Sequence, residues 1–303
     1  LAVNKLSGFL FGREMPSTPT AGFGSPGQVS SVFLNGSWGY GNYNAAFATV
    51  KMQQWHGLTL VSNLTWSKTL GTQAVAQSTS GFTPVDAFNL HNQYGPQPFD
   101  FRLIYNTYMV WEPSWYKGQK GIVGHLLGGW KFSPIFTALS GAPVEVNVDG
   151  DCQAYGEINC SSGGTNENAI LMSPYTGGNS VHYNVPGSNG IGTSQPLTNI
   201  NMFANPAAVY NQFRAPLVGF DNQTGGQGVL RGLPTWNLDM SVGKEFRITE
   251  RVNTKFIATF TNVLNHNQLN NPSLSITSPQ SFGVIFGQAN TPRQMEFGIR
   301  IGF

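Results

Sequence analysis

The stretch that decides the fold is the last ten residues, Gln294-Met295-Glu296-Phe297-Gly298-Ile299-Arg300-Ile301-Gly302-Phe303. Apolar side chains alternate here with polar residues or glycine. Successive side chains of a β-strand point to opposite faces, so the pattern predicts a strand with one apolar and one polar face. The apolar face carries Met295, Phe297, Ile299, Ile301 and Phe303. Such a strand suits a sheet that meets hydrocarbon on one side and water on the other.

The same alternation recurs upstream and predicts further strands. It is clearest in residues 236–247 and 252–261 and looser nearer the N-terminus. The looser segments are residues 3–11, 43–49, 58–67, 101–111 and 130–138. Together they make seven strands, with residues 3–11 as a candidate eighth. A strand of about eleven residues, rising about 3.3 Å per residue and tilted by about 40°, covers about 28 Å of bilayer.

The connections between these strands give an independent indication, because three short links alternate with three long polar stretches. The short links cover residues 54–57, 112–124 and 247–251, and the long stretches cover residues 69–98, 149–234 and 265–292. A membrane barrel with tight periplasmic turns and wide external loops has this order, whereas a soluble β-sandwich has no reason to keep it. Tryptophans near strand ends are typical of an aromatic girdle: Trp66, Trp111, Trp130 and Trp236.

The composition agrees with a protein that crosses a membrane with strands. Only 10% of the 303 residues are charged, against about 25% in an ordinary soluble domain. No run of about 18 apolar residues is present, which excludes a transmembrane helix, and no Lys/Arg cluster indicates nucleic-acid binding. We therefore predict an all-β, antiparallel transmembrane β-barrel in the bacterial outer membrane. Eight strands could close a small barrel or form the last part of a larger one.

Several short motifs carry a family resemblance through their order and spacing. They are Tyr43-Asn44-Ala45, His56-Gly57-Leu58 and residues 64–70; Phe99-Asp100-Phe101-Arg102, Leu127-Gly128-Gly129-Trp130 and Ser140-Gly141-Ala142-Pro143; residues 231–239 and 260–266; and residues 293–303. Taken together they resemble the C-terminal barrel of TonB-dependent outer-membrane receptors. The resemblance is greatest to the Oar-like group, whose members carry an N-terminal carboxypeptidase-regulatory-like domain.

This resemblance implies that residues 1–303 form a partial barrel, about strands fifteen to twenty-two of a 22-stranded one. The plug domain and TonB box of such receptors are not visible in the chain. The resemblance further implies import of a bulky solute, such as a glycan, peptide or chelate. The implied partners are outer-membrane lipid, the barrel-assembly machinery, and the TonB complex through a missing N-terminal part. Two alternatives are a non-transporting surface barrel for adhesion or export, and a self-contained eight-stranded outer-membrane protein.

Two sets of residues are candidates for function. The closing strand, with Met295, Phe297, Ile299, Ile301 and Phe303 on one face, resembles the signal read by the barrel-assembly machinery. The same residues also suit a strand that merely faces lipid. Charged residues expected to line the lumen are Arg102, Lys131, Asp239, Glu245, Lys255, Glu296 and Arg300. They could line a solute path or hold a plug, or they could form cross-strand ion pairs that only satisfy a wet interior.

The remaining candidate chemistry does not indicate an enzyme. Cys152 and Cys160 predict a disulfide in an oxidising, extracytoplasmic setting, with two reduced thiols as the alternative. The five histidines lack metal-ligand spacing, and no nucleophile motif is present, so no cofactor is expected. The long external loop over about residues 149–234 is rich in tyrosine and phenylalanine. It could capture a ligand or act as a partial lid, or it could be a variable surface loop without a ligand.

The assembly-signal hypothesis makes one prediction about the C-terminal residue. Deleting Phe303 should lower the amount of protein assembled in the outer membrane, because the closing strand would lose its terminal aromatic side chain. The amount is measured by immunoblotting of outer-membrane fractions. Unchanged assembly would contradict the hypothesis.

Overall fold

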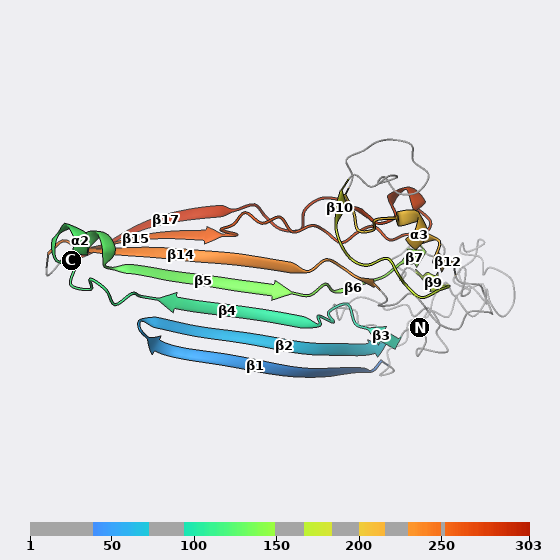
Figure 1. The fold of residues 1–303 in the computed structure, drawn as a ribbon, viewed down its shortest axis with the longest axis horizontal. Helices are drawn as coiled ribbons and strands as arrows, with labels where there is room; N and C mark the ends of the chain where they lie inside the picture. Colours follow the sequence, from blue (N-terminus) through green and yellow to red (C-terminus); the bar gives the residue numbers. More distant parts are fainter. Residues whose placement is uncertain (1–38, 73–93, 149–166, 184–199, 216–229, 250–251) are drawn as a thin grey trace, which may run out of the picture.

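The computed structural model describes residues 39–72, 94–148, 167–183, 200–215, 230–249 and 252–303. Its main feature is an antiparallel sheet of seven long strands, with a short strand, β3 (Tyr94–Pro96), added beside β2. The long strands are β1 (Gly41–Trp55), β2 (Leu58–Thr72), β4 (Leu103–Trp111), β5 (Trp130–Leu139), β14 (Thr235–Arg247), β15 (Asn253–Thr261) and β17 (Gln294–Gly302). They lie side by side in chain order (Figure 1). The antiparallel all-β fold predicted from the sequence is confirmed, while the candidate strand over residues 3–11 lies outside the described residues.

The pairing register keeps apolar side chains on one face of the sheet. Ala258 of β15 lies opposite Phe297 of β17. Lys255, which projects to the other face of β15, lies opposite Glu245 of β14 and Arg300 of β17. Directly opposed residues of antiparallel strands project to the same face. The alternation in the sequence therefore becomes an apolar face and a polar face that extend across neighbouring strands.

Several residues depart from this division, among them Lys244 and Phe47. Lys244 of β14 projects to the apolar face, where it lies between Trp130 of β5 and Phe256 of β15. Phe47 of β1 projects to the polar face opposite Thr65 and is 79% exposed. The polar face therefore includes an apolar side chain that nothing covers among the described residues.

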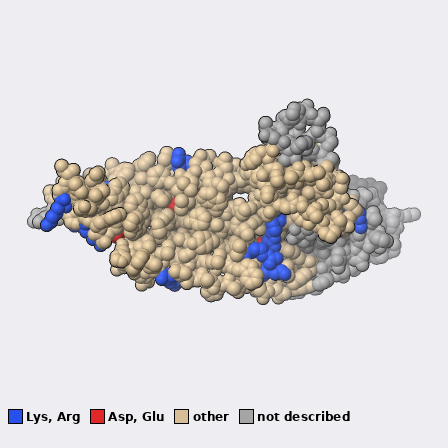
Figure 2. Space-filling view, viewed as in Figure 1, with Lys and Arg blue, Asp and Glu red and all other residues tan. Residues whose placement is uncertain are grey.

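The two edges of this sheet are open within the described part of the chain. β1 and β17 each pair with a neighbour on one side only, and nearly all of their residues are exposed. Few charged side chains appear across the face seen in Figure 2. Long, weakly charged edge strands pair readily with other strands, and closing a barrel removes such edges. The seven strands thus have the properties of an arc of a barrel.

The two ends of the sheet differ in their connections. At the end where the C-terminus lies, β1 joins β2 and β14 joins β15 by short links (Figure 1). The third connection at this end joins β4 to β5 and contains a helix, α2 (Gly121–Leu127). We call this the turn end and the opposite end the loop end. None of the helices in the described ranges has the length and apolar character needed to cross a bilayer.

The turn between β1 and β2 depends on one glycine. Gly57 has φ +84° and follows His56, which has φ 49°. A Cβ added at Gly57 would lie 2.0 Å from the backbone oxygen of Glu112. Glycine is therefore required both for the left-handed backbone and for the close approach of the β4–β5 link. This explains why a His-Gly-Leu motif stands at this position.

At the loop end, the segments after β5 and after β15 fold together into one body. We call it the loop-end body; it comprises the described residues within 140–234 and 262–293. Its short elements are β6 (Pro143–Val144), β7 (Asn147–Val148), β8 (Glu167–Asn168), β9 (Ile170–Leu171), β10 (His182–Tyr183), β11 (Ile200–Asn201), α3 (Pro206–Tyr210), β12 (Phe213–Arg214), β13 (Leu230–Arg231), η2 (Pro279–Ser281) and β16 (Val284–Ile285). Strand β11 joins the two segments by pairing with β16.

This body has a hydrophobic core of its own. The rings of Phe203 and Phe282 stack with centroids 5.7 Å apart, and Tyr210 meets Phe282 edge-on at 5.3 Å. The buried Asn201 side chain donates to the carbonyl of Phe282 at 3.1 Å and accepts from the backbone N–H of Phe203 at 2.8 Å. The sequence predicted surface loops here, whereas the described parts of these loops form a packed structure.

A fully buried carboxylate, Asp100, connects the loop-end body to the sheet. One oxygen accepts from the backbone N–H of Thr69 in β2 at 2.5 Å. The other lies 2.5 Å from Nη2 of Arg231 in β13 and 3.3 Å from Nε of Arg102. Because these groups belong to β2, to the residue before β4 and to the loop-end body, Asp100 holds these three segments together.

Two motifs next to Asp100 complete this junction. The Ser140 hydroxyl accepts from the backbone N–H groups of Arg102 at 2.8 Å and Leu103 at 3.1 Å. A Cβ added at Gly141 would lie 1.8 Å from the carbonyl oxygen of Gly232. The Ser-Gly and Arg-Gly motifs of the resemblance therefore meet at one point, where the backbones approach too closely for any side chain at Gly141.

The junction predicts a large effect for one conservative substitution. Asp100→Asn should lower the free energy of unfolding by about 3 kcal/mol, because it leaves the Arg231 guanidinium without its anionic partner. Equilibrium urea unfolding in phospholipid vesicles measures this loss. The control is Glu112→Gln, which removes an exposed ion pair and should cost less than about 1 kcal/mol. Equal losses for the two variants would contradict the role of Asp100.

Candidate functional site

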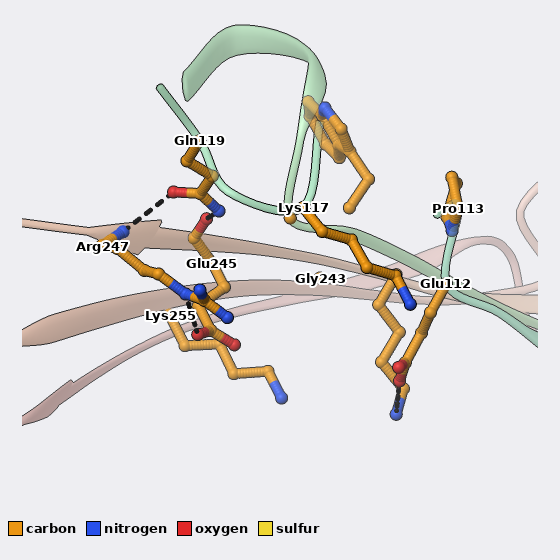
Figure 3. A pocket seen from close by; sticks show the side chains of 11 residues that line it. Glu112, Pro113, Lys117, Gln119, Gly243, Glu245, Arg247 and Lys255 are labelled. Atoms are coloured by element: carbon orange, nitrogen blue, oxygen red, sulfur yellow. Dashed lines mark hydrogen bonds and ion pairs between the residues drawn. The ribbon is translucent and has the colours of Figure 1, made fainter. Parts of the chain in front are cut away.

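The polar face of the sheet holds a pocket at its turn end (Figure 3). We call it the turn-end pocket, an open cavity of about 270 Å³. Its walls come from the β4–β5 link, from the start of β5 and from the final residues of β14, with one residue of β15. The lining residues are Glu112, Pro113, Lys117, Gln119, Gly129, Trp130, Lys131, Gly243, Glu245, Arg247 and Lys255.

Gln119 holds the β4–β5 link against β14 and so forms one wall of the pocket. Its side-chain nitrogen donates to the carbonyl of Glu245 at 2.7 Å, and its side-chain oxygen accepts from the backbone N–H of Arg247 at 3.0 Å. Gly129 has φ +74°, and a Cβ there would lie 2.2 Å from the Gln119 amide. The second glycine of the Gly128-Gly129 pair therefore has a structural role, because the absence of a side chain lets Gln119 reach β14.

The charges of this pocket are unequal. Four cationic side chains and two carboxylates line it, an excess of two positive charges. Lys131 Nζ lies 2.8 Å from the Glu112 carboxylate, and Arg247 Nε lies 3.8 Å from that of Glu245 (Figure 3). The hydrogen bond from Lys131 lowers the pKa of Glu112, which stays ionised at neutral pH. The pocket can therefore attract an anionic group, although both of its ion pairs are partly exposed.

A family model described as "Outer membrane beta barrel domain" matches residues 12–296. The chain belongs to this family. Comparisons with curated proteins and with solved structures gave no match. The protein is therefore a β-barrel protein of the bacterial outer membrane, a class that is typically non-enzymatic.

Six of the seven charged residues expected to line the barrel lumen share the polar face. Lys131, Glu245 and Lys255 lie together in the turn-end pocket. On β17, Arg300 lies opposite Lys255, and Glu296 lies opposite Thr259 farther along the strand. The shared face agrees with the sequence-based expectation, and their contact with a lumen stays a prediction because this sheet is an open arc.

Asp239 and Arg102 have local structural partners instead. Asp239 Oδ1 accepts from the Asn237 side chain and from the backbone N–H of Asn262, both at 2.8 Å. Arg102 lies outside the turn-end pocket and pairs with Asp100 at the loop-end junction. These contacts favour a structural role for both residues in the barrel wall and its rim.

The late motif containing His266 is also explained by structure. The ring of His266 stacks on Trp236 with centroids 3.9 Å apart. The Asn262 side chain accepts from the backbone N–H of His266 and donates to the carbonyls of His266 and Thr291. Asn262 and Asn265 both adopt positive φ, which asparagine tolerates better than most residues. The motif therefore builds the loop-end turn between β15 and β17.

The residues of the candidate assembly signal share the apolar face of β17. Met295, Phe297, Ile299, Ile301 and Phe303 are all more than half exposed. Among contacts between described residues, Phe297 is the member of this set whose ring meets others, those of Phe256 and Phe260 in β15. This is the geometry of a lipid-facing strand, and recognition by the assembly machinery stays a prediction. Cys152 and Cys160 lie outside the described residues, so their predicted disulfide is untested.

The sequence did not reveal the turn-end pocket as a site. Glu112, Lys117 and Gln119 belong to an irregular link, where no strand period shows which side chains converge. The one feature of the sequence that could have indicated the pocket is a glycine within a strand. Gly243 lies directly opposite Lys131 on the polar face and leaves space between the neighbouring strands.

The ion pair in this pocket predicts a pH effect with a definite sign. A carboxyl group whose pKa is lowered by folding stabilises the protein above its unfolded-state pKa, and this contribution disappears as the pH falls through the lower folded-state pKa. Lys131→Met should therefore raise the pKa of Glu112 toward its ordinary value. Carboxyl-carbon NMR of labelled glutamate measures the titration. Lys51→Met, in β1 and outside the lining of the pocket, is the control and should leave the titration unchanged.

Proposed function

We propose that this chain is the C-terminal membrane part of a TonB-dependent receptor that imports a bulky solute. The observation that carries the proposal is the sheet of seven long strands with a broad polar face. A barrel of about eight strands fills its interior with its own side chains. Here the polar face combines charged side chains such as Lys255 with large apolar ones such as Phe47 and Ile135. A wide lumen with separate contents suits such a face better than a filled small barrel.

The features at the two ends support the same proposal. Short turns of outer-membrane barrels face the periplasm and long loops face outward. The loop-end body then lies outside the cell, where it captures the solute, and the turn-end pocket lies at the periplasmic mouth. A plug domain and the segment that contacts the TonB complex would be supplied from outside these residues. The positive charge of the turn-end pocket suits acidic groups of such a plug.

One observation favours a second function, adhesion or export without transport. The loop-end body is a packed structure that exposes apolar side chains, including Met172, Tyr183 and Phe286. An exposed apolar surface of this kind can bind another macromolecule. In that case, the barrel would anchor a binding body at the cell surface, and no TonB complex would be needed.

The mass of the natural protein and its contact with TonB test the import proposal. Outer membranes are probed with an antibody against residues 293–303, with and without formaldehyde cross-linking. The proposal expects a heat-modifiable species of about 100 kDa or more, as a 22-stranded barrel with a plug requires. It also expects a cross-linked band that disappears when TonB is deleted.

Two results would contradict the proposal. A heat-modifiable species near the 32.8 kDa of this chain would indicate a small self-contained barrel. A large species without any TonB-dependent band would favour the surface-binding alternative. An unrelated porin, probed in the same membranes, controls for non-specific cross-linking.

A further inference from the structure

The helix α2 at the turn end presents four apolar side chains to the surface, together with the exposed His125. Ile122 is 89% exposed, Leu126 66%, Val123 54% and Leu127 47%. Only Gly124 is buried, against the backbone of Gln119, where an added Cβ would lie 2.8 Å away. The described residues leave about half or more of each of these four side chains uncovered. A helix that is apolar on its exposed side needs a non-aqueous partner.

Contacts from the apolar face of the sheet hold the C-terminal end of this helix. Lys244, the only charged residue of β14 on that face, donates from Nζ to the carbonyl of Leu126 at 3.1 Å and to that of Gly128. Trp130 donates from its ring nitrogen to the same Leu126 carbonyl at 3.0 Å. The Lys244 ammonium also lies 4.8 Å from the centre of the Trp130 ring. These contacts attach α2 to the side of the sheet that meets lipid.

They also explain a charge that would otherwise be costly at the lipid face. An ammonium group near hydrocarbon needs hydrogen-bond acceptors or an aromatic face. Lys244 has both, and it is only 4% exposed. Cations are favourable at a helix C-terminus, where carbonyl groups lack partners within the helix. Lys244 is therefore a positioning residue for α2.

Aromatic residues continue the apolar surface from α2 onto the strands. Trp111 of β4 lies opposite Phe132 of β5, with ring centroids 5.6 Å apart. Trp115, in the link before α2, lies 5.8 Å from Trp111 and is 56% exposed. Tryptophans gather at the headgroup level of outer-membrane barrels. The surface of α2 is thus continuous with the membrane-facing surface of the barrel, at the height of the lipid interface.

We propose that α2 lies in the plane of the outer membrane at the turn end, with Ile122, Val123, Leu126 and Leu127 inserted among the phospholipid acyl chains near their headgroups. The helix then acts as an in-plane anchor beside the barrel wall, and Lys244 sets its position. This inference rests on the outer-membrane location of the family and is independent of solute import.

Fluorescence quenching tests this placement in the natural full-length protein. Single cysteines are introduced by Ile122→Cys or Leu126→Cys, in a background whose natural cysteines are replaced by serine. Each is labelled with an environment-sensitive dye, and the protein is reconstituted in phosphatidylethanolamine–phosphatidylglycerol vesicles. Lipids with a nitroxide near the headgroup should quench both labels about twofold or more, and aqueous iodide should quench them weakly. The heat-induced mobility shift on gels confirms that each labelled variant is folded.

The matched control is Lys117→Cys, in the same β4–β5 link but in the turn-end pocket (Figure 3). Its label should show the reverse pattern, with strong iodide quenching and little lipid quenching. The placement is overturned if labels at residues 122 and 126 behave like the label at residue 117.

The role of Lys244 has a separate readout. Lys244→Met should reduce lipid quenching of the residue-126 label by about half or more, because the helix end loses its attachment. A label at Phe297→Cys, on the lipid-facing side of β17, should be unaffected. Lys255→Met, on the polar face of β15, should change neither label. Unchanged quenching at residue 126 in Lys244→Met would overturn the positioning role of Lys244.

Discussion

The antiparallel register of the long strands is the constraint on which the rest of the structure depends. In a bilayer each backbone N–H and C=O group must bond to a neighbouring strand. A shift of one residue would turn every apolar side chain of a strand toward the polar side. Two local structures oppose such a shift. The tight turn at Gly57 fixes β1 against β2 at the turn end, and the Asp100 junction fixes β2 and β4 against the loop-end body.

The parts of the structure that follow from this register were predictable from the sequence. Strands β14, β15 and β17 show a clear period of two, broken on β14 by Lys244, and the shared face of Lys131, Glu245 and Lys255 follows from the same period. The loop-end body was not predictable in this way. Many of its strands are two residues long, and its core joins Phe203 to Phe282, which are far apart in sequence. The local sequence pattern does not predict contacts between residues so far apart.

The helix α2 and the turn-end pocket were also not predicted, because neither produces a pattern in the local sequence. Seven residues are too few to establish a helical period, and apolar residues occur on most of the helix surface. Gln119 contributes to the pocket through bonds to β14, a strand more than a hundred residues later. By contrast, Arg102 was assigned to the lumen from its alternation alone, while its position is set by the buried Asp100.

The motifs behind the family resemblance have mostly structural explanations. Asp100, Gly141 and Arg231 meet at the loop-end junction, and Asn262 builds the turn that leads to β17. These motifs therefore indicate the architecture of the barrel and do not indicate which solute it binds. On the proposed function, selectivity belongs to the loop-end body, whose surface is set by packing within that body and by attachment through Arg231.

Spin-label accessibility along the central strand β14 tests the membrane-spanning sheet most directly. Labels are placed one at a time at residues 238–243 of the protein in phospholipid vesicles. Accessibility to oxygen should be high at Leu238, Met240 and Val242, and accessibility to a water-soluble nickel complex should be high at Asp239, Ser241 and Gly243. Accessibility without this alternation, or with its phase reversed, would contradict the assignment of the two faces and with it the lipid-facing barrel wall.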